Sequence, residues 1–240
     1  MVAHLNGRRV DAVLVDAGGV LVDPNWPLVA EVLERHGVHV DPIALAGAEP
    51  IAKRRWDDAD AIRGTTDLVR RERFLAQILR IAGVDFDTDE VEAATDEVEA
   101  LHRERGIWEI VPGGAAEALD VLRGAGLRLA LASNAEPMLR DKLGQLGLAH
   151  RFDHLTISGE IGVEKPDPAF FRAALDALDV PAERAVHVGD FYEIDVVGAR
   201  SAGLEAILVD VAGLSTDRDV TRIRALSEVP GLLGIADDRY

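Results

Sequence analysis

The sequence has 240 residues, of which 48% are hydrophobic, and a formal net charge of -17. That length can bury a sizeable core in one large domain or two small ones, and the negative charge disfavours nucleic acid and anionic membranes as partners. Cysteine is absent, which excludes disulfides and thiolate chemistry and suits a cytoplasmic protein. We expect no signal peptide, because the first ten residues lack a long apolar stretch. We also expect no membrane span, because no uncharged apolar run of about 18 residues occurs.

The first predicted element is a strand at residues 11–16, DAVLVD, which is a short apolar run rich in β-branched residues. Residues 24–107 then show helical periodicity throughout. The amphipathic segments in this stretch are residues 26–37, 42–59, 65–83 and 89–106. We therefore expect a small helical insertion that follows the first strand and serves as a lid.

From residue 113 onward, predicted helices and strands alternate. The helices are residues 113–126, 135–147, 167–180 and 193–203, and the strands are residues 127–133, 152–159, 183–190 and 204–210. Strands that alternate with helices of this length form a parallel sheet that is covered on both faces. The tail from about residue 215 is expected to end in a helix and a loop.

The pattern as a whole predicts an α/β protein, with a doubly wound parallel sheet and an inserted α-helical cap domain. The core would comprise residues 1–23 and 108–240, and the cap would comprise residues 24–107. Ligands of such sheets bind beyond the carboxyl ends of the strands. The residues that carry chemistry are therefore expected where these strands end.

Several polar residues fall at or near these strand ends. Asp16, Ser133 and Asp190 end three of the predicted strands, Lys165 follows a fourth, and Asp195 comes five residues after Asp190. Such a set suits phosphoryl transfer. A carboxylate can attack phosphorus, a hydroxyl and an ammonium can hold phosphoryl oxygens, and carboxylates can bind Mg2+.

These residues, in this order, resemble the four motifs of the haloacid dehalogenase superfamily. The first motif, Asp-x-Asp-Gly-Thr/Val-Leu/Val, corresponds to residues 16–21, DAGGVL. The second corresponds to Ser133 after an apolar strand, the third to Lys165 before Pro166, and the fourth, Gly-Asp-x-x-x-x-Asp, to residues 189–195. The resemblance covers essentially the whole chain and implies a Rossmann-like core with the helical cap of subfamily I.

The resemblance also implies catalytic roles. Asp16 would be the nucleophile that forms an aspartyl-phosphate, while Ser133 and Lys165 would hold the phosphoryl group. Lys165 would also keep Asp16 ionised. Asn134 either touches the substrate or is only a turn residue. The residues expected to bind substrate are Gly18, Gly19, Ser133, Asn134 and Lys165.

The cofactor implied by the resemblance is Mg2+. Its ligands would be Asp16, Asp190 and the backbone carbonyl of Gly18, and Asp195 would bind metal-bound water or orient its neighbours. Small glycines would let backbone N–H groups near Gly18 approach the phosphate closely. The expected partner is a small phosphorylated metabolite.

Gly18 departs from the family pattern, because phosphatases of this superfamily usually have a second aspartate there as general acid and base. Loss of a general acid typically costs about 10²- to 10⁴-fold in rate. Either the leaving group needs little protonation, or another group substitutes, or activity is weak. Tyr192, Glu193 and a cap side chain are candidate substitutes.

Three alternatives to a phosphatase stay open. Phosphonatases of the superfamily also lack the second aspartate and use a cap lysine as a Schiff base, and Lys53 is the only lysine of the cap. Dehalogenases share Ser133-Asn134, but they need no Mg2+ and do not keep the pair Asp190 and Asp195. A non-catalytic phosphate-binding module is supported only by Gly18.

Some of these residues also have purely structural interpretations. Ser133 and Glu136 have the spacing of a helix capping box, and Asp190 could cap the following helix. The Lys-Arg-Arg run at 53–55 is either a solvated helix face or a clamp for the substrate. The seven histidines lack metal-ligand spacing and are interpreted as structural. An apolar face left exposed on the cap would support a homodimer.

Overall fold

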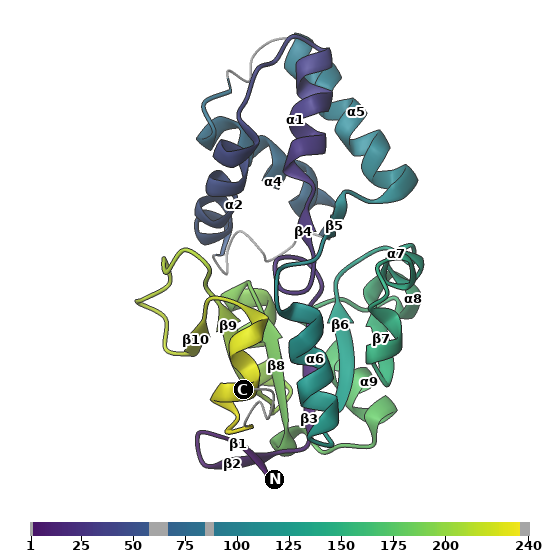
Figure 1. Ribbon diagram of the computed structural model, residues 1–240, viewed down its shortest axis with the longest axis vertical. Coiled ribbons are helices and arrows are strands. Elements are labelled where there is room, and N and C mark those ends of the chain that lie inside the picture. The colour runs from purple at the N-terminus through teal and green to yellow at the C-terminus, as the bar shows by residue number, and fades with distance from the viewer. Residues whose placement is uncertain (1, 58–66, 85–88, 236–240) are drawn as a thin grey trace. The chain divides into compact units, whose positions relative to one another are not determined.

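The computed structural model describes residues 2–57, 67–84 and 89–235. The chain divides into two compact units, one formed by Met1–Asp23 and Val111–Tyr240 and the other by Pro24–Ile110 (Figure 1). The second unit begins where the cap was expected to begin and ends at Ile110 rather than at residue 107.

A six-stranded sheet forms the centre of the first unit. Its strands run in the order β10-β9-β8-β3-β6-β7, and every neighbouring pair is parallel. The strands are β3 (Ala12–Val15), β6 (Arg128–Ser133), β7 (His154–Ile157), β8 (Ala185–Gly189), β9 (Glu205–Val209) and β10 (Thr221–Ile223). The predicted α/β class and parallel sheet are therefore confirmed.

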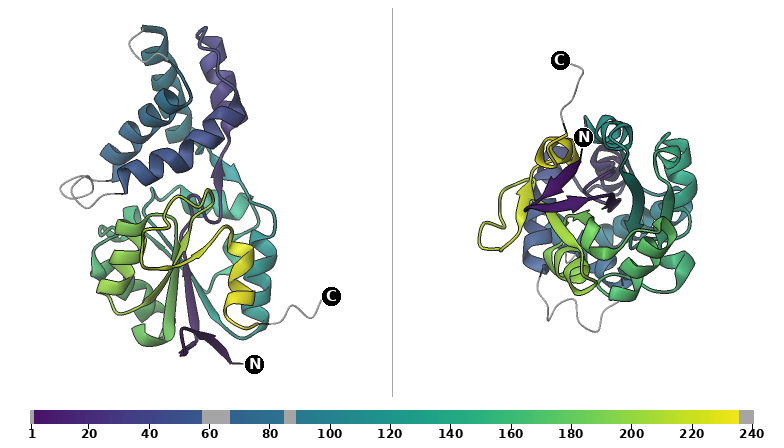
Figure 2. Two further views of the ribbon diagram at one scale, coloured as in Figure 1. Left: turned by 90° about the vertical axis from the view of Figure 1, so that its left-hand side faces the viewer. Right: turned by 90° about the horizontal axis from the view of Figure 1, so that it is seen from below.

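Helices cover both faces of this sheet, with α9 and α10 on one face and α6 and α11 on the other (Figure 2). A continuous apolar core joins the inner strands to α9 and α10. The helical elements of this unit are α6 (Ala115–Gly124), α7 (Leu139–Gln145), α8 (Ser158–Ile161), α9 (Pro168–Leu178), the π-helical η3 (Tyr192–Val197), α10 (Gly198–Ser201) and α11 (Val229–Leu232), with short 3-10 turns η1 (Ala149–Arg151), η2 (Ala182–Arg184) and η4 (Leu226–Glu228).

Three short strand pairings were not predicted. An antiparallel hairpin of β1 (Ala3–Leu5) and β2 (Arg8–Val10) precedes the sheet. A two-stranded ribbon of β4 (Asp23–Pro24) and β5 (Trp108–Ile110) lies where the chain passes between the units. In the tail, β10 adds an unpredicted edge strand to the sheet before the expected helix, which is α11. All are too short for their periodicity to be distinctive in sequence.

In the second unit the described residues form four helices. They are α1 (Trp26–Arg35), α2 (Pro42–Trp56), α4 (Asp67–Ile81) and α5 (Asp89–Arg105). Asn25 and Asp41 cap α1 and α2 with their side chains, and each helix has a proline in its first turn. The expected helix ends at residues 58–59 and 65–66 lie outside the described residues. No described helix is long and apolar enough to cross a membrane.

Candidate active site

Asp16 stands directly after the central strand β3. Its backbone N–H donates to the Val188 carbonyl at 2.9 Å, which continues the pairing of β3 with β8. The side chain is largely buried, and its Oδ1 accepts a hydrogen bond of 2.7 Å from the N–H of Ala17. Asp16 is therefore held at the carboxyl edge of the sheet, where ligands of parallel sheets bind.

The glycines after Asp16 build a closed turn. The Ala17 carbonyl accepts hydrogen bonds from Leu21 and Val22, and the Gly19 N–H donates to the Val22 carbonyl at 2.9 Å. Gly19 has a φ of 68°, a conformation that side chains other than glycine rarely adopt. The Gly19 amide is thus used inside the turn, which differs from its expected contact with substrate.

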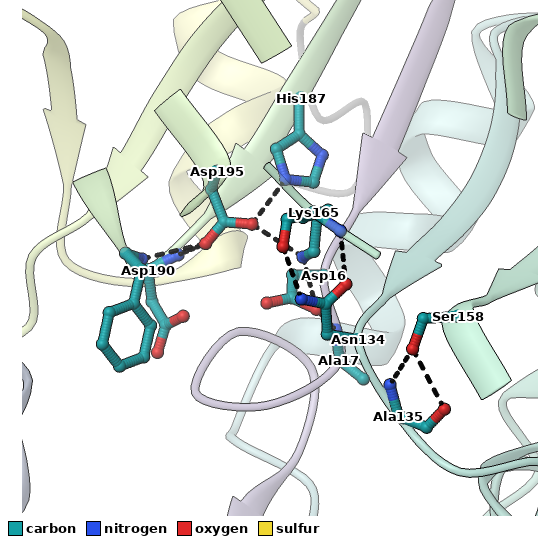
Figure 3. Close-up of polar contacts among 10 residues, drawn as sticks. Asp16, Ala17, Asn134, Ala135, Ser158, Lys165, His187, Asp190 and Asp195 are labelled. Carbon is teal, nitrogen blue, oxygen red and sulfur yellow. Dashed lines mark hydrogen bonds and ion pairs between the residues drawn. The ribbon is translucent and has the colours of Figure 1, made fainter. Parts of the chain in front are cut away.

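Lys165 is buried, with 1% of its side chain exposed, and its ammonium lies between two carboxylates (Figure 3). Nζ is 3.1 Å from Oδ1 of Asp16 and 2.7 Å from Oδ1 of Asp195. Burial by itself lowers the pKa of Lys165, but the charges of both carboxylates outweigh burial and raise that pKa above its ordinary value. Lys165 therefore carries a positive charge next to Asp16.

Asn134 holds the backbone of Lys165 in place. Its side-chain Oδ1 accepts from the Lys165 N–H at 2.7 Å, and its Nδ2 donates to the Lys165 carbonyl at 2.9 Å. The preceding residue, Ser133, ends β6 and is buried. The side chain of Asn134 thus positions Lys165, which lies before a cis bond to Pro166.

The expected capping box of Ser133 and Glu136 is wrong. The helix begins only at Leu139, and its N-cap, Met138, makes no side-chain hydrogen bond. Two features keep the intervening residues out of a helix. Pro137 disfavours the helical conformation at Glu136, and Ser158 accepts a hydrogen bond from the Ala135 N–H.

Asp195 is almost completely buried, and each of its oxygens accepts two hydrogen bonds. Oδ1 accepts from Lys165 and His187, and Oδ2 accepts from the backbone N–H groups of Asp190 and Phe191. Burial raises the pKa of Asp195, but the Lys165 charge and the His187 hydrogen bond outweigh it and lower that pKa below its ordinary value. Asp195 therefore fixes the turn after β8. The N-cap of η3 is Phe191, so Asp190 does not stand at the capping position that was considered for it.

Asp16, Asp190 and Asp195 can each place one carboxylate oxygen within 4.8 Å of the others. Such hard oxygen donors fit Mg2+. Both oxygens of Asp195 already accept two hydrogen bonds, whereas the two hydrogen bonds that Asp16 makes with described residues both use Oδ1. The geometry therefore favours Asp16 and Asp190 as direct ligands, with Asp195 orienting its neighbours.

His187 belongs to this cluster, although the sequence pattern suggested only a structural residue. Its ring is fully buried, and Nε2 lies 2.9 Å from Oδ1 of Asp195. Strand alternation in the sequence could have indicated this, because His187 and Gly189 lie two residues apart and therefore on the same face of β8. A Cβ on Gly189 would lie only 2.2 Å from Cγ of Asp195, so Asp195 packs on that same face.

The comparison with protein families matches a model described as haloacid dehalogenase-like hydrolase over residues 10–203. This chain belongs to that family. This haloacid dehalogenase-like hydrolase is 44% identical over 141 residues to a protein named phosphoserine phosphatase from Thermus thermophilus. That match covers 58% of this chain and 54% of the relative, so the chain spans about half the length of that relative.

Two solved structures resemble this haloacid dehalogenase-like hydrolase across most of its length. A structure titled as a HAD phosphatase from Thermococcus onnurineus has a TM-score of 0.59 and 26% identity, and the match covers 94% of this chain and 98% of that one. A structure titled as a 2-haloacid dehalogenase from Pseudomonas syringae has a TM-score of 0.58 and 27% identity, with the same coverage of both chains. Both phosphatases and dehalogenases thus occur among its structural relatives.

Two candidates for the missing acid of this haloacid dehalogenase-like hydrolase contact the same arginine. The guanidinium of Arg218 lies 4.5 Å from the centre of the Tyr192 ring. Its Nη1 is 3.5 Å from Oε1 of Glu193. Both side chains therefore contact Arg218.

Lys53 is engaged within the cap of this haloacid dehalogenase-like hydrolase. Its Nζ is 2.8 Å from Oε1 of Glu49, and both side chains are mostly buried. The indole N–H of Trp26 donates to the same carboxylate at 3.2 Å, and the Lys53 ammonium lies 5.9 Å from the centre of a Trp108 ring. The ion pair and cation–π contact give Lys53 a packing role within the bundle.

Proposed function

We propose that this chain is a phosphatase that hydrolyses small phosphate monoesters through an aspartyl-phosphate at Asp16. The observation that supports this most directly is the buried Lys165 ammonium, 3.1 Å from Oδ1 of Asp16 at the carboxyl edge of the sheet. A fixed positive charge beside a carboxylate suits the attack of that carboxylate on a phosphoryl group, because it offsets the negative charge of the phosphoryl oxygens.

In the proposed reaction a carboxylate oxygen of Asp16 attacks phosphorus, the bond from phosphorus to the leaving oxygen breaks, and the leaving group departs as its anion. Lys165 and the Ser133 hydroxyl hold the phosphoryl oxygens. Water then cleaves the aspartyl-phosphate and releases inorganic phosphate. Asn134 supports this geometry through its two hydrogen bonds to the backbone of Lys165.

We include Mg2+ as the cofactor in this proposal, held by Asp16, Asp190 and the backbone carbonyl of Gly18. When bound, Mg2+ would neutralise negative charge on the phosphoryl group. The support is the set of carboxylate oxygens within 4.8 Å of one another and the preference of Mg2+ for oxygen ligands.

Because residue 18 is a glycine, the choice of the first substrate for an activity assay depends on its leaving group. Glycine has no proton to give, so a leaving group that is stable as an anion is the most suitable probe. p-Nitrophenyl phosphate has such a leaving group. Alkyl phosphates, whose alkoxide needs a proton, are expected to turn over more slowly.

The test is turnover of p-nitrophenyl phosphate with Mg2+ and with a chelator, for the wild type and Asp16→Asn. We expect activity that needs Mg2+ and falls at least 10³-fold in Asp16→Asn, because the amide is a poor nucleophile. Asp120→Asn is the matched control, since Asp120 is half exposed and paired with Arg151. Equal rates in Asp16→Asn and the wild type would contradict the proposal.

A 2-haloacid dehalogenase is the second candidate, favoured by the similarity to the Pseudomonas syringae structure. The same nucleophile, Asp16, would then attack carbon and displace halide. Halide release from 2-chloropropionate in the presence of a chelator, without any phosphatase activity, would replace the leading proposal with this one.

A further inference from the structure

His187 is a buried polar residue that the mechanism above does not use. Its ring is fully buried in β8 and meets the edge of Phe171 on α9, with 5.1 Å between ring centroids. Its Nε2 lies 2.9 Å from Oδ1 of Asp195. Because the Asp195 carboxylate can only accept, Nε2 carries the hydrogen and donates it.

The second ring nitrogen of His187 indicates which contact explains a polar side chain at this position. Among the described residues, Nδ1 of His187 is buried without a hydrogen-bond partner. A phenylalanine or leucine would fill such an apolar position without burying an unpaired nitrogen. The polar side chain is therefore accounted for by its single contact, the one to Asp195.

That contact falls on the same oxygen that Lys165 uses. Oδ1 of Asp195 accepts from Lys165 at 2.7 Å and from His187 at 2.9 Å, while Oδ2 accepts from two backbone N–H groups. The four donors fix the rotation of the carboxylate. Because Lys165 and His187 share Oδ1, the Lys165 ammonium is attracted less strongly to Asp195 than it would be alone. The ammonium also contacts Asp16, at 3.1 Å (Figure 3).

We propose that His187 is a positioning residue, which acts through Asp195 to hold the Lys165 ammonium against the nucleophile Asp16. Without the His187 donor, Oδ1 is left to Lys165 alone, and the ammonium shifts toward Asp195 and away from Asp16. The consequence for catalysis rests on the function proposed above, whereas the hydrogen bond itself does not.

The kinetic test compares His187→Leu and His187→Gln with the wild type on p-nitrophenyl phosphate. Leucine fills space without a donor, and glutamine keeps an N–H at a similar reach. We expect His187→Leu to lower kcat by about 10- to 100-fold, as for other residues that orient a catalytic group, with KM little changed. His187→Gln should recover most of that loss.

Thr156→Val is the matched control. Thr156 is fully buried in β7 of the same sheet, and its hydroxyl has no hydrogen-bond partner among the described residues. Valine has nearly the same shape, so kcat should stay at the wild-type value. Thermal unfolding of all variants shows which of them are folded at the assay temperature.

A double-mutant cycle separates positioning from packing. If His187 acts only through Asp195, His187→Leu lowers kcat in the wild type but has no further effect in Asp195→Ala, which removes the accepting oxygen. Additive losses, or equal kcat values for His187→Leu and His187→Gln, would overturn the proposal and leave His187 as a packing residue.

A spectroscopic measurement keeps this test independent of phosphatase activity. Nitrogen-15 NMR of the histidine rings should show His187 with its hydrogen on Nε2, and that signal should shift in Asp195→Asn. If the wild type does not turn over p-nitrophenyl phosphate, the proposed function fails while the hydrogen bond is still observed. A hydrogen on Nδ1, or no shift in Asp195→Asn, overturns the positioning proposal itself.

Discussion

At Gly189 the backbone comes so close to Asp195 that a side chain has no space. A Cβ there would lie 2.2 Å from Cγ and 2.6 Å from Oδ2 of Asp195. The Gly-Asp-x-x-x-x-Asp pattern thus has a physical reason in this chain. The turn after β8 folds Asp195 back onto Gly189, and from there its carboxylate contacts both Lys165 and His187.

We predict that Gly189→Ala displaces the Asp195 carboxylate, lowers turnover of p-nitrophenyl phosphate at least tenfold and destabilises the fold. Clashes of this kind typically cost about 1–3 kcal/mol in unfolding free energy. The control is Gly144→Ala in α7, where an added Cβ meets nothing within 4 Å. That substitution should stabilise the protein by up to about 1 kcal/mol through helix propensity. Urea unfolding compares the stabilities of the two variants, and kcat for p-nitrophenyl phosphate compares their turnover.

At the scale of elements, the site depends on loops that follow different strands of the sheet. The loop after β6 is joined to the segment after β7 by Asn134, which bonds both backbone groups of Lys165, and by Ser158, which bonds both backbone groups of Ala135. Lys165 therefore depends on β6 for its position, although it lies 32 residues beyond the end of that strand.

We predict that Asn134→Ala lowers kcat/KM by about tenfold, because Lys165 loses the two hydrogen bonds that hold its backbone in place. The loss of these two partly buried hydrogen bonds should also cost about 1–3 kcal/mol of unfolding free energy. Ser158→Ala is the comparison, since it breaks the contacts to Ala135 and spares those to Lys165. A larger kinetic effect of Ser158→Ala than of Asn134→Ala would contradict this assignment.

At the scale of the whole molecule, a chain with a net charge of -17 buries one of its three lysines between carboxylates. The pKa of Lys165 is raised above its ordinary 10.5, so its contribution to stability is complete below that pH and is lost as pH rises through the folded-state pKa. The pKa of Asp195 is lowered below its ordinary 3.8, so its contribution is complete above that pH and is lost as pH falls.

We therefore predict that both charges of this pair persist across neutral pH in the wild type, so that any pH dependence in Lys165→Met comes from the carboxylates left without their cation. Lys165→Met should cost roughly 3–5 kcal/mol at pH 7, since it leaves buried carboxylates without their cation. The cost should shrink as pH falls, because protonation removes the unpaired charge. Urea unfolding from pH 5 to pH 8 with a chelator measures this, with Lys142→Met as control. A cost that does not depend on pH would contradict the prediction.

Local pattern in the sequence was enough for five of the six parallel strands, most of their helices and the helical insertion. Buried strands such as residues 12–15 are uninterrupted apolar runs, and amphipathic helices repeat their apolar residues along one face. The order of the strand-end motifs was equally readable, because parallel strands bring their carboxyl ends to one edge. The short strands β4, β5 and β10 were not predictable, since two or three residues carry no periodicity.

Only the tertiary structure decided how the strand-end residues are used. In sequence, Asn134 was a candidate for substrate contact, Lys53 a candidate for a Schiff base, and His187 one of several scattered histidines. The fold places Asn134 on the backbone of Lys165, pairs Lys53 with Glu49, and turns His187 toward Asp195. Hydrogen bonds and ion pairs join residues that are distant in the chain, so their partners depend on packing, which local sequence does not encode.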